Sequence, residues 1–168
     1  MGKTFVLIKP EAFDRREDIE KDITENNFSI VEKKELKWIW SQIRKTYSKE
    51  NLKYYGSNRA NTLMSFLIPY VITRKFGQDP PIEVLILSSE GDTIKDFVEI
   101  CGPRDAMEYV KEEFKNTLRG KYGLGPEHSF SRTIEGRDCR FEFNGIHKSS
   151  REEEYREELA IYFPDLLS

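Results

Sequence analysis

The sequence lacks the residues and runs that mark several classes of protein. It has only two cysteines in 168 residues, Cys101 and Cys139, which are too few and too far apart for a disulfide framework and suit a reducing compartment as free thiols. The longest apolar run, around residues 63–72, is broken by Ser65 and Pro69 and is shorter than the roughly 20 residues that span a bilayer. Since no signal region precedes the first strand-like run, we expect a cytoplasmic protein that does not bind membranes.

An excess of basic charge is also missing. Lys and Arg number 27 against 30 Asp and Glu, and the net charge of −3 disfavours a dedicated nucleic-acid-binding protein. Apolar residues make up 38% of the chain, with 11 Phe, 8 Tyr and 2 Trp, which is enough to bury a core. Because the chain has one domain's length and no linker, repeat or low-complexity tract, we expect a single domain over residues 1–168.

Short apolar runs alternate with helical periodicities along the chain. Strands are predicted at residues 4–8, 29–40 and 82–87. Helices are predicted at residues 11–25, 41–50 with Ser41 as N-cap, 61–72, 93–100, about 107–114, and 151–161. Residues 130–134 and 139–143 flank a turn-like tetrad, which indicates a small hairpin. This order predicts an α+β protein with a ferredoxin-like (βαββαβ), antiparallel four-stranded sheet covered by helices.

Three side chains with phosphate chemistry stand near the ends of predicted elements. His147 lies at a strand-to-helix junction ahead of two serines, and such a junction favours phosphate. A neutral imidazole can attack a phosphoryl group if another residue fixes its second ring nitrogen, which Glu158 is able to do. Lys9 follows the first strand, and Arg119 precedes a glycine; both suit phosphate pairing. Taken singly, the His147 segment is equally typical of an ordinary polar helix start, and a lone lysine such as Lys9 more commonly reaches solvent, an alternative that also applies to Arg119.

Four blocks of the sequence, taken in order, resemble the motifs of the nucleoside diphosphate kinase family. The blocks are Thr4–Glu11, Leu118–Gly123, Asn144–His147 and Glu157–Phe163. The resemblance extends from about residue 3 to residue 164. It implies a ping-pong reaction in which His147 takes the γ-phosphoryl group of ATP or another nucleoside triphosphate and gives it to a nucleoside diphosphate, with Mg²⁺ bridging the phosphates. It also implies a homo-oligomer.

The resemblance further implies roles for individual residues. The matched positions comprise two phosphate-binding cations, the site tyrosine, an asparagine that contacts ribose and phosphate, and the nucleophile with its two supporting residues: Lys9, Arg119, Tyr47, Asn144, His147, Ser149 and Glu158. The family holds the base mainly by stacking, for which Tyr55, Met64 and Phe66 are alternative candidates. No metal ligand on the protein itself is expected, since Mg²⁺ comes with the nucleotide.

The sequence departs from the family pattern close to these positions. A family arginine aligns with Val98, so one phosphate-binding cation is missing, and Arg104 or Lys95 is a candidate to replace it. The glycine that follows the family's histidine is Lys148 here, which either crowds the site or adds attraction for phosphate. An insertion at about residues 124–143 is a candidate lid or oligomer contact.

Three other functions fit parts of the sequence. A catalytically weakened nucleotide-binding or regulatory member of the same fold would explain Val98 and Lys148. Two thiols and two imidazoles make a set of the kind that binds zinc, without the usual spacing: Cys101, His128, Cys139 and His147. Cations interleaved with tyrosines suit single-stranded nucleic acid or simply a solvated helix face: Arg44, Lys45, Lys49, Lys53, Arg59, Tyr47, Tyr54 and Tyr55. The joint survival of the matched residues favours the kinase.

Overall fold

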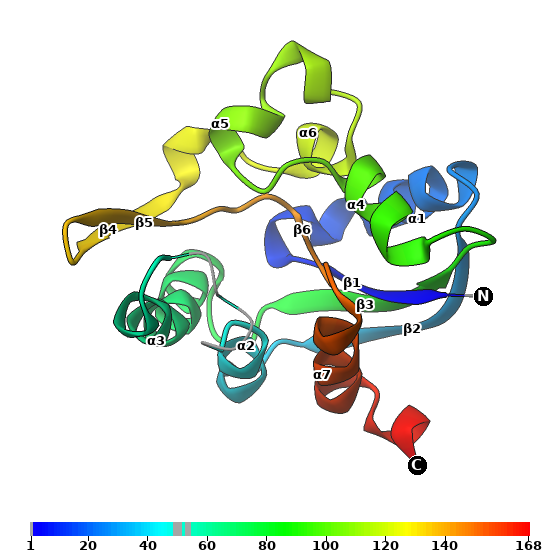
Figure 1. Cartoon of the computed structure of the whole chain (residues 1–168), viewed down its shortest axis with the longest axis horizontal. Coiled ribbons are helices and arrows are strands. Elements are labelled where there is room, and N and C mark those ends of the chain that lie inside the picture. The colour runs from blue at the N-terminus through cyan, green and yellow to red at the C-terminus, as the bar shows by residue number, and fades with distance from the viewer. Residues whose placement is uncertain (1, 49–51, 53–54) are drawn as a thin grey trace.

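A four-stranded antiparallel sheet with helices on both faces forms the centre of the molecule (Figure 1). The computed structural model describes residues 2–48, 52 and 55–168. The sheet has the order β2-β3-β1-β6, and its strands are β1 (Lys3–Ile8), β2 (Ser29–Lys37), β3 (Pro81–Ser88) and β6 (Ile146–Lys148). The connecting helices α1 (Arg16–Glu25) and α4 (Thr93–Cys101) complete the βαββαβ order. The predicted ferredoxin-like fold is therefore confirmed.

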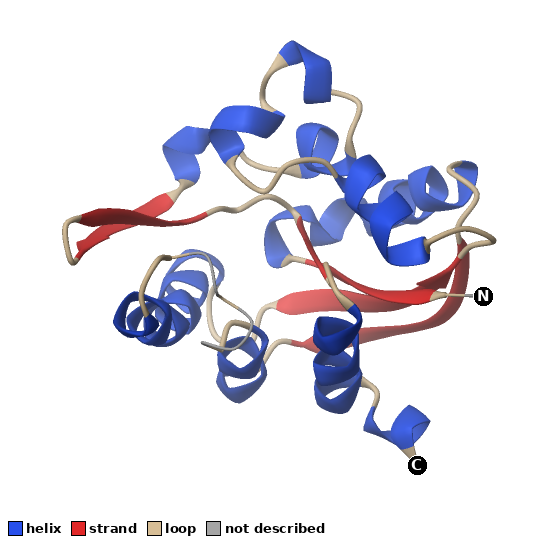
Figure 2. Cartoon of the chain, viewed as in Figure 1, coloured by secondary structure: helices blue, strands red, loops and turns tan. Residues whose placement is uncertain are grey.

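The remaining elements are inserted into this plan. The additional helices are α2 (Trp40–Thr46), α3 (Asn58–Phe76), α5 (Ala106–Tyr109), α6 (Leu118–Tyr122) and α7 (Glu152–Tyr162). Four short 3-10 helices lie at Pro10–Arg15, Glu112–Phe114, Pro126–His128 and Pro164–Leu167. A separate two-stranded sheet is formed by β4 (Phe130–Ile134) and β5 (Arg137–Phe141), which extends to one side of the molecule (Figure 2).

The alternation of side chains along β1 creates a core on each face of the sheet. Phe5 and Leu7 belong to the larger core, which includes residues of α2, α3 and α7, whereas Val6 and Ile8 belong to the core beneath α1 and α4. None of these four side chains has exposed surface. A strand buried on both faces reads as a continuous apolar run, which is why this segment was recognisable from the sequence.

The predicted strand over residues 29–40 and the cap after it differ from the structure. β2 ends at Lys37, and α2 begins at Trp40 with Ile39 at its N-cap, so the prediction of Ser41 as N-cap is wrong. Ile39 adopts an extended backbone conformation and makes no side-chain capping bond. A register shift at Val31 also interrupts the alternation that the sequence suggested.

Four helix predictions also change. The helix predicted over residues 41–50 ends at Thr46 as α2. The 11–25 segment begins as a 3-10 helix and becomes α-helical only at Arg16. The 61–72 helix extends to Asn58–Phe76, because the Ser57 hydroxyl accepts the backbone N–H of Ala60 at 3.0 Å. The 107–114 segment divides into α5 and a 3-10 helix, since Lys111 between them is extended.

The predicted hairpin is present within the insertion and packs against α3. Glu135 and Gly136 join β4 to β5, and both have positive φ angles, 52° and 74°, as a type I′ turn requires. The Tyr55 hydroxyl donates to the carbonyl of Arg140 at 2.7 Å, and the Ser57 hydroxyl donates to Glu135 at 2.6 Å. These bonds fix the hairpin beside the N-terminal end of α3.

No helix among the described residues is both long and apolar enough to cross a membrane. Cys101 and Cys139 are both buried as free thiols.

Candidate active site

His147 is held by two residues that β6 and α7 bring together. It lies opposite Leu7 of β1 on the edge strand of the sheet. Its Nε2 atom is hydrogen-bonded to Oε1 of Glu158, and Oε2 of Glu158 accepts the hydroxyl of Ser149. An ionised carboxylate only accepts hydrogen bonds, so Nε2 carries the ring proton and Nδ1 keeps its lone pair. Nδ1 is therefore the nucleophilic atom of the ring.

The packing of α7 on the sheet places Glu158 in the interior. Glu158 shares the buried face of this helix with Leu159 and Tyr162, since residues three or four apart lie on one face. The Tyr162 hydroxyl accepts the indole N–H of Trp38 at 2.7 Å, and its ring stacks on Phe5 with 5.2 Å between centroids. Glu158 is 1% exposed as a result, so water does not compete for its two hydrogen bonds.

Lys9 is buried instead of reaching solvent. Its Nζ atom donates to the carbonyl of Glu142 at 2.7 Å and to Oδ1 of Asn144 at 3.3 Å, and it forms an ion pair with Glu11 at 3.3 Å. Burial lowers the pKa of Lys9, and the Glu11 carboxylate opposes this effect by raising it. The end of β1 thus carries a fixed ammonium group that depends on one carboxylate to stay charged.

Glu11 also fixes the turn that leads into β6. Its Oε1 atom accepts the backbone N–H of Gly145 at 3.0 Å. Gly145 has a φ angle of 80°, and a Cβ atom there would lie 3.0 Å from the carbonyl oxygen of Tyr122. Glu11 therefore holds both Lys9 and the turn before His147. It stands in the first matched block, but sequence spacing alone gave it no role.

Arg119 crosses from α6 to the start of β6. Its Nε and one terminal nitrogen donate to the carbonyl of Ile146 at 3.2 and 2.9 Å, and the other terminal nitrogen donates to the carbonyl of Gly102 at 3.2 Å. Gly120 allows the tight approach of this segment, since a Cβ atom there would lie 2.1 Å from the carbonyl oxygen of Phe114. Neutral carbonyls orient the guanidinium group without cancelling its charge.

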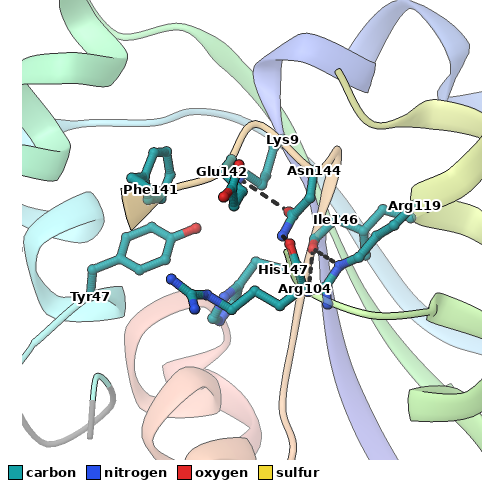
Figure 3. Close-up of a pocket in the computed structure, with 9 residues that line it drawn as sticks. All are labelled: Lys9, Tyr47, Arg104, Arg119, Phe141, Glu142, Asn144, Ile146 and His147. Atoms are coloured by element: carbon teal, nitrogen blue, oxygen red, sulfur yellow. Dashed lines mark hydrogen bonds between the residues drawn. The ribbon is translucent and has the colours of Figure 1, made fainter. Parts of the chain in front are cut away.

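Two adjoining cavities lie beside His147. Both are lined by Tyr47, Arg104, Arg119 and His147. The narrow cavity, of about 50 Å³, is also lined by Lys9, Phe141, Glu142, Asn144 and Ile146 (Figure 3). The larger cavity, of about 290 Å³, is lined in addition by Thr46, Leu52, Lys148, Ser150, Glu154 and Glu158. Of the eight predicted site residues, the structure thus places seven in the cavity walls and Ser149 directly behind, bonded to Glu158.

Aromatic rings form one side of the narrow cavity. The ring of Tyr47 meets the imidazole of His147 edge-on, with 5.3 Å between centroids, and Phe141 meets Tyr47 in the same way at 5.3 Å. Phe141 and Glu142 come from the end of the hairpin insertion, so the insertion contributes to the wall of the cavity (Figure 3). Sequence reasoning missed both residues, because no motif links an inserted hairpin to a distant strand end.

Arg104 and Lys95, the candidate replacements for a cation at Val98, lie in different places. Arg104 lines both cavities, and its guanidinium donates to the carbonyl of Arg140 at 2.9 Å and to the Tyr55 hydroxyl at 3.3 Å. Lys95 is exposed on α4 and is not among the described residues that line either cavity. Only Arg104 of the two is therefore positioned to act beside His147.

The candidate base-stacking residues do not line either cavity in the described part of the chain. Tyr55 and Met64 are buried in the larger core. Phe66 is half exposed, but the guanidinium of Arg44 covers its ring at 3.9 Å from the centroid. The position of a bound base is therefore not given by any of these three side chains.

Two of the three tyrosines in the pattern suggested for nucleic acid offer no exposed stacking face. Tyr47 and Tyr55 are buried. Lys49, Lys53 and Tyr54 lie outside the described residues. The described part of the pattern therefore lacks the exposed aromatic faces expected of a single-strand binder.

The proposed zinc set is not brought together. Within residues 2–48, 52 and 55–168, no group of three or more His, Cys, Asp or Glu side chains is placed to hold a metal ion. The Nε2 atom of His147 is already bonded to Glu158. The cavity walls include four cations and an asparagine, which suit phosphate oxygens, together with the carboxylates of Glu142, Glu154 and Glu158.

Fold and site together define an α+β protein that presents a hydrogen-bonded histidine beside fixed cations. Residues 2–166 match the family described as nucleoside diphosphate kinase, and the chain belongs to this family.

Similarity to individual proteins is low. The chain is 24% identical over 165 residues to human nucleoside diphosphate kinase homolog 5, covering 98% of this chain and 63% of that protein. It is 26% identical over 167 residues to thioredoxin domain-containing protein 6 of Xenopus laevis, covering 96% of this chain and 22% of that protein. The chain thus spans less than two thirds of either relative. The solved nucleoside diphosphate kinase of Borrelia burgdorferi has the same fold, with a TM-score of 0.66 and 20% identity over 98% of this chain and 88% of that one.

Proposed function

We propose that the protein is a nucleoside diphosphate kinase that transfers the γ-phosphoryl group of a nucleoside triphosphate to a nucleoside diphosphate through phospho-His147. One observation carries this proposal: Glu158, itself held by Ser149, fixes the ring of His147 through Nε2, at the wall of cavities that Arg104 and Arg119 also line. A histidine with a purely structural role would have no need of adjacent cations.

In the first half-reaction, the Nδ1 lone pair of His147 attacks the γ-phosphorus. The bond from this phosphorus to the bridging oxygen breaks, and the nucleoside diphosphate leaves with the electron pair. The phosphorylated ring is positively charged, and the buried carboxylate of Glu158 stabilises that charge through Nε2–H. In the second half-reaction, a terminal oxygen of another nucleoside diphosphate attacks the phosphorus and the P–N bond breaks, which returns His147 to its neutral form.

The cations around His147 act on the phosphate oxygens. Lys9, Arg104 and Arg119 would neutralise charge on the transferring group, and the Asn144 side chain and the Tyr47 hydroxyl would orient the nucleotide (Figure 3). Donor and acceptor phosphoanhydrides are close in energy, so one set of cations serves both half-reactions. Base identity then matters little.

Mg²⁺ fits this site as an ion held by the nucleotide. The two carboxylates of the larger cavity already have partners: Glu158 bonds His147 and Ser149, and Glu154 accepts the N–H of Ser150 and a guanidinium nitrogen of Arg151. Mg²⁺ commonly binds through substrate phosphates and retains waters. When bound with the nucleotide, it would neutralise part of the charge of the phosphates.

Similarity to a solved relative supports the ligand class. The kinase of Borrelia burgdorferi was determined with bound vanadate and ADP as a transition-state mimic. A nucleotide-binding member of the family that transfers phosphate poorly is the second candidate, and Val98 favours it, because a family cation is absent at this position. The homo-oligomer implied by family membership remains a prediction.

Phosphoryl transfer from Mg-ATP to a second nucleoside diphosphate tests the proposal. The His147→Ala variant should lose transfer, and the matched control His128→Ala should retain it, because His128 is half exposed on a 3-10 helix and is not among the described residues lining the cavities. Nucleotide binding without transfer by the wild-type protein would favour the second candidate. Equal transfer by His147→Ala and the wild type would reject the proposed nucleophile.

A further inference from the structure

Lys148 is a cation beside the nucleophile that the proposed reaction has not used. It follows His147 on β6 and lines the larger cavity, whereas Lys9 lines only the narrow one. Successive side chains of a strand point to opposite faces of the sheet, so the side chains of His147 and Lys148 start on different faces. β6 is an edge strand, and the long side chain of Lys148 reaches the same cavity as the ring of His147.

Lys148 has a neutral hydrogen-bond partner and no direct ion pair among the described residues, although the Glu154 and Glu158 carboxylates lie near enough to raise its pKa. Its Nζ atom donates to the hydroxyl of Ser150 at 2.8 Å, which is a neutral acceptor. No carboxylate forms an ion pair with Lys148 among the residues that the structure describes, whereas Lys9 is paired with Glu11. Burial lowers the pKa of Lys148, and the Glu154 and Glu158 carboxylates oppose this effect only in part, so a bound anion would further stabilise the charged form.

The charged residues that line the larger cavity also favour an anionic ligand. It is lined by three cations, Arg104, Arg119 and Lys148, and by two carboxylates. Glu158 is bonded to His147 and Ser149 in the proposed mechanism, and Glu154 is bonded to the backbone of Ser150 and to Arg151. Arg119 donates its hydrogen bonds to the backbone carbonyls of Ile146 and Gly102, which leave its charge in place. The cations in the wall outnumber the carboxylates, and Glu154 is paired with Arg151, so an anionic ligand is favoured.

We infer that Lys148 is a phosphate-binding residue, which holds the phosphate chain of the nucleotide in the larger cavity while Lys9 acts in the narrow cavity on the other side of His147. The inference rests on the proposed function and names one further residue of the same site. The sequence left two effects open for Lys148, crowding of the site and attraction for phosphate. The inference favours attraction for phosphate.

Binding measurements separate this inference from the proposed function. We would titrate the full chain with ADP and with pyrophosphate, which carries the phosphate groups alone, by calorimetry. Lys148→Met should weaken binding of both ligands at least about tenfold, the size expected from losing a charged hydrogen bond. Lys148→Arg, which keeps the charge, should bind within a few-fold of the wild type. Lys95→Met is the matched control, because it removes an exposed lysine of α4 outside both cavity walls, and it should bind like the wild type.

The outcomes are distinguishable. Unchanged or tighter binding by Lys148→Met, with a melting temperature equal to that of the wild type, would overturn the inference and indicate crowding. A loss of affinity shared equally by Lys95→Met would also overturn it, because a general charge effect would then suffice. If the wild type binds ADP but forms no phosphohistidine, the proposed function fails while the role of Lys148 in binding still stands. If the wild type binds neither ligand, both fail.

Discussion

Two buried glutamates on opposite faces of the sheet have opposite surroundings. Glu158, on α7, is bonded through both oxygens, to His147 and to Ser149. Glu83, on β3, shares its face with the core beneath α1 and α4, and its Oε1 atom has no hydrogen-bond partner among the described residues. Both are 1% exposed, so burial alone does not separate them. The hydrogen-bond donors separate them: both oxygens of Glu158 have a donor, one of which is His147, whereas Oε1 of Glu83 has none among the described residues and the pKa of Glu83 is raised.

Burial of Glu83 without enough hydrogen-bond donors raises the pKa of its carboxyl group. Burial, with the Glu20 carboxyl beside it, raises the pKa of Glu83 to about 7. Glu35 of β2 lies opposite Glu83 in the sheet and adds negative charge. None of Glu20, Glu35 and Glu83 lines either cavity. We therefore expect the charge of Glu83 to affect the stability of the protein and not the chemistry at His147.

The largest expected effect comes from breaking the hydrogen bonds at Glu158. Glu158→Gln removes the charge that stabilises the phosphorylated ring and allows the amide to donate to His147, which favours the wrong tautomer. We expect transfer to fall roughly 10²–10⁴-fold, the range for residues that orient or assist a reactive histidine. Steady-state kinetics with Mg-ATP and a second nucleoside diphosphate measure it. A fall of less than threefold would show that Glu158 only fills space.

The corresponding change at Glu83 should affect stability and leave transfer unchanged. Between about pH 4.5 and pH 7 the folded protein holds a proton on Glu83 that the unfolded chain has released, so stability decreases as the pH rises through this window. Glu83→Gln mimics the protonated group and should raise the free energy of unfolding by roughly 1–3 kcal/mol at pH 8, with little change near pH 4. Urea unfolding at the two pH values measures this. An equal effect at both would reject the protonation argument.

Glu11 combines features of Glu158 and Glu83, because only one of its oxygens has partners in the described part of the chain. We expect its substitution to have the smallest effect on transfer. One of its oxygens pairs with Lys9 and with the N–H of Gly145, and the other has no partner among the described residues. Glu11→Gln keeps an acceptor for Gly145 but removes the charge that raises the pKa of Lys9. Lys9 should then lose its proton at lower pH, so the alkaline decline of kcat/KM should move to lower pH. A profile that falls in height without moving would assign Glu11 a structural role only.

The sequence was sufficient for the plan of the fold and insufficient for its junctions. The unbroken apolar run of β1 and the glycine-bounded helices predict a βαββαβ order, because burial on both faces of a strand leaves a clear pattern. The end of β2 was missed, since Val31 shifts the register and Ile39 caps α2 through its backbone alone. Neither the register shift nor the N-cap requires a particular side chain, so the sequence does not reveal either of them.

The site divides in the same way. His147 and Lys9 were predicted because they stand in motifs of contiguous residues. The contribution of Phe141 depends on how an inserted hairpin packs, and the contact of Glu11 with Gly145 joins segments more than a hundred residues apart. Lys148 was recognised as unusual, but whether its side chain reached the cavity was decided by its position on an edge strand.

Direct detection of the phosphorylated protein tests the central claim. We would incubate the full chain with Mg-ATP labelled in the γ-phosphate, then measure protein-bound label before and after acid treatment and after adding a nucleoside diphosphate. The account predicts up to one acid-labile phosphate per chain, present in His128→Ala, absent from His147→Ala and discharged by the diphosphate. Label that persists in His147→Ala, or that the diphosphate cannot remove, would contradict transfer through this histidine.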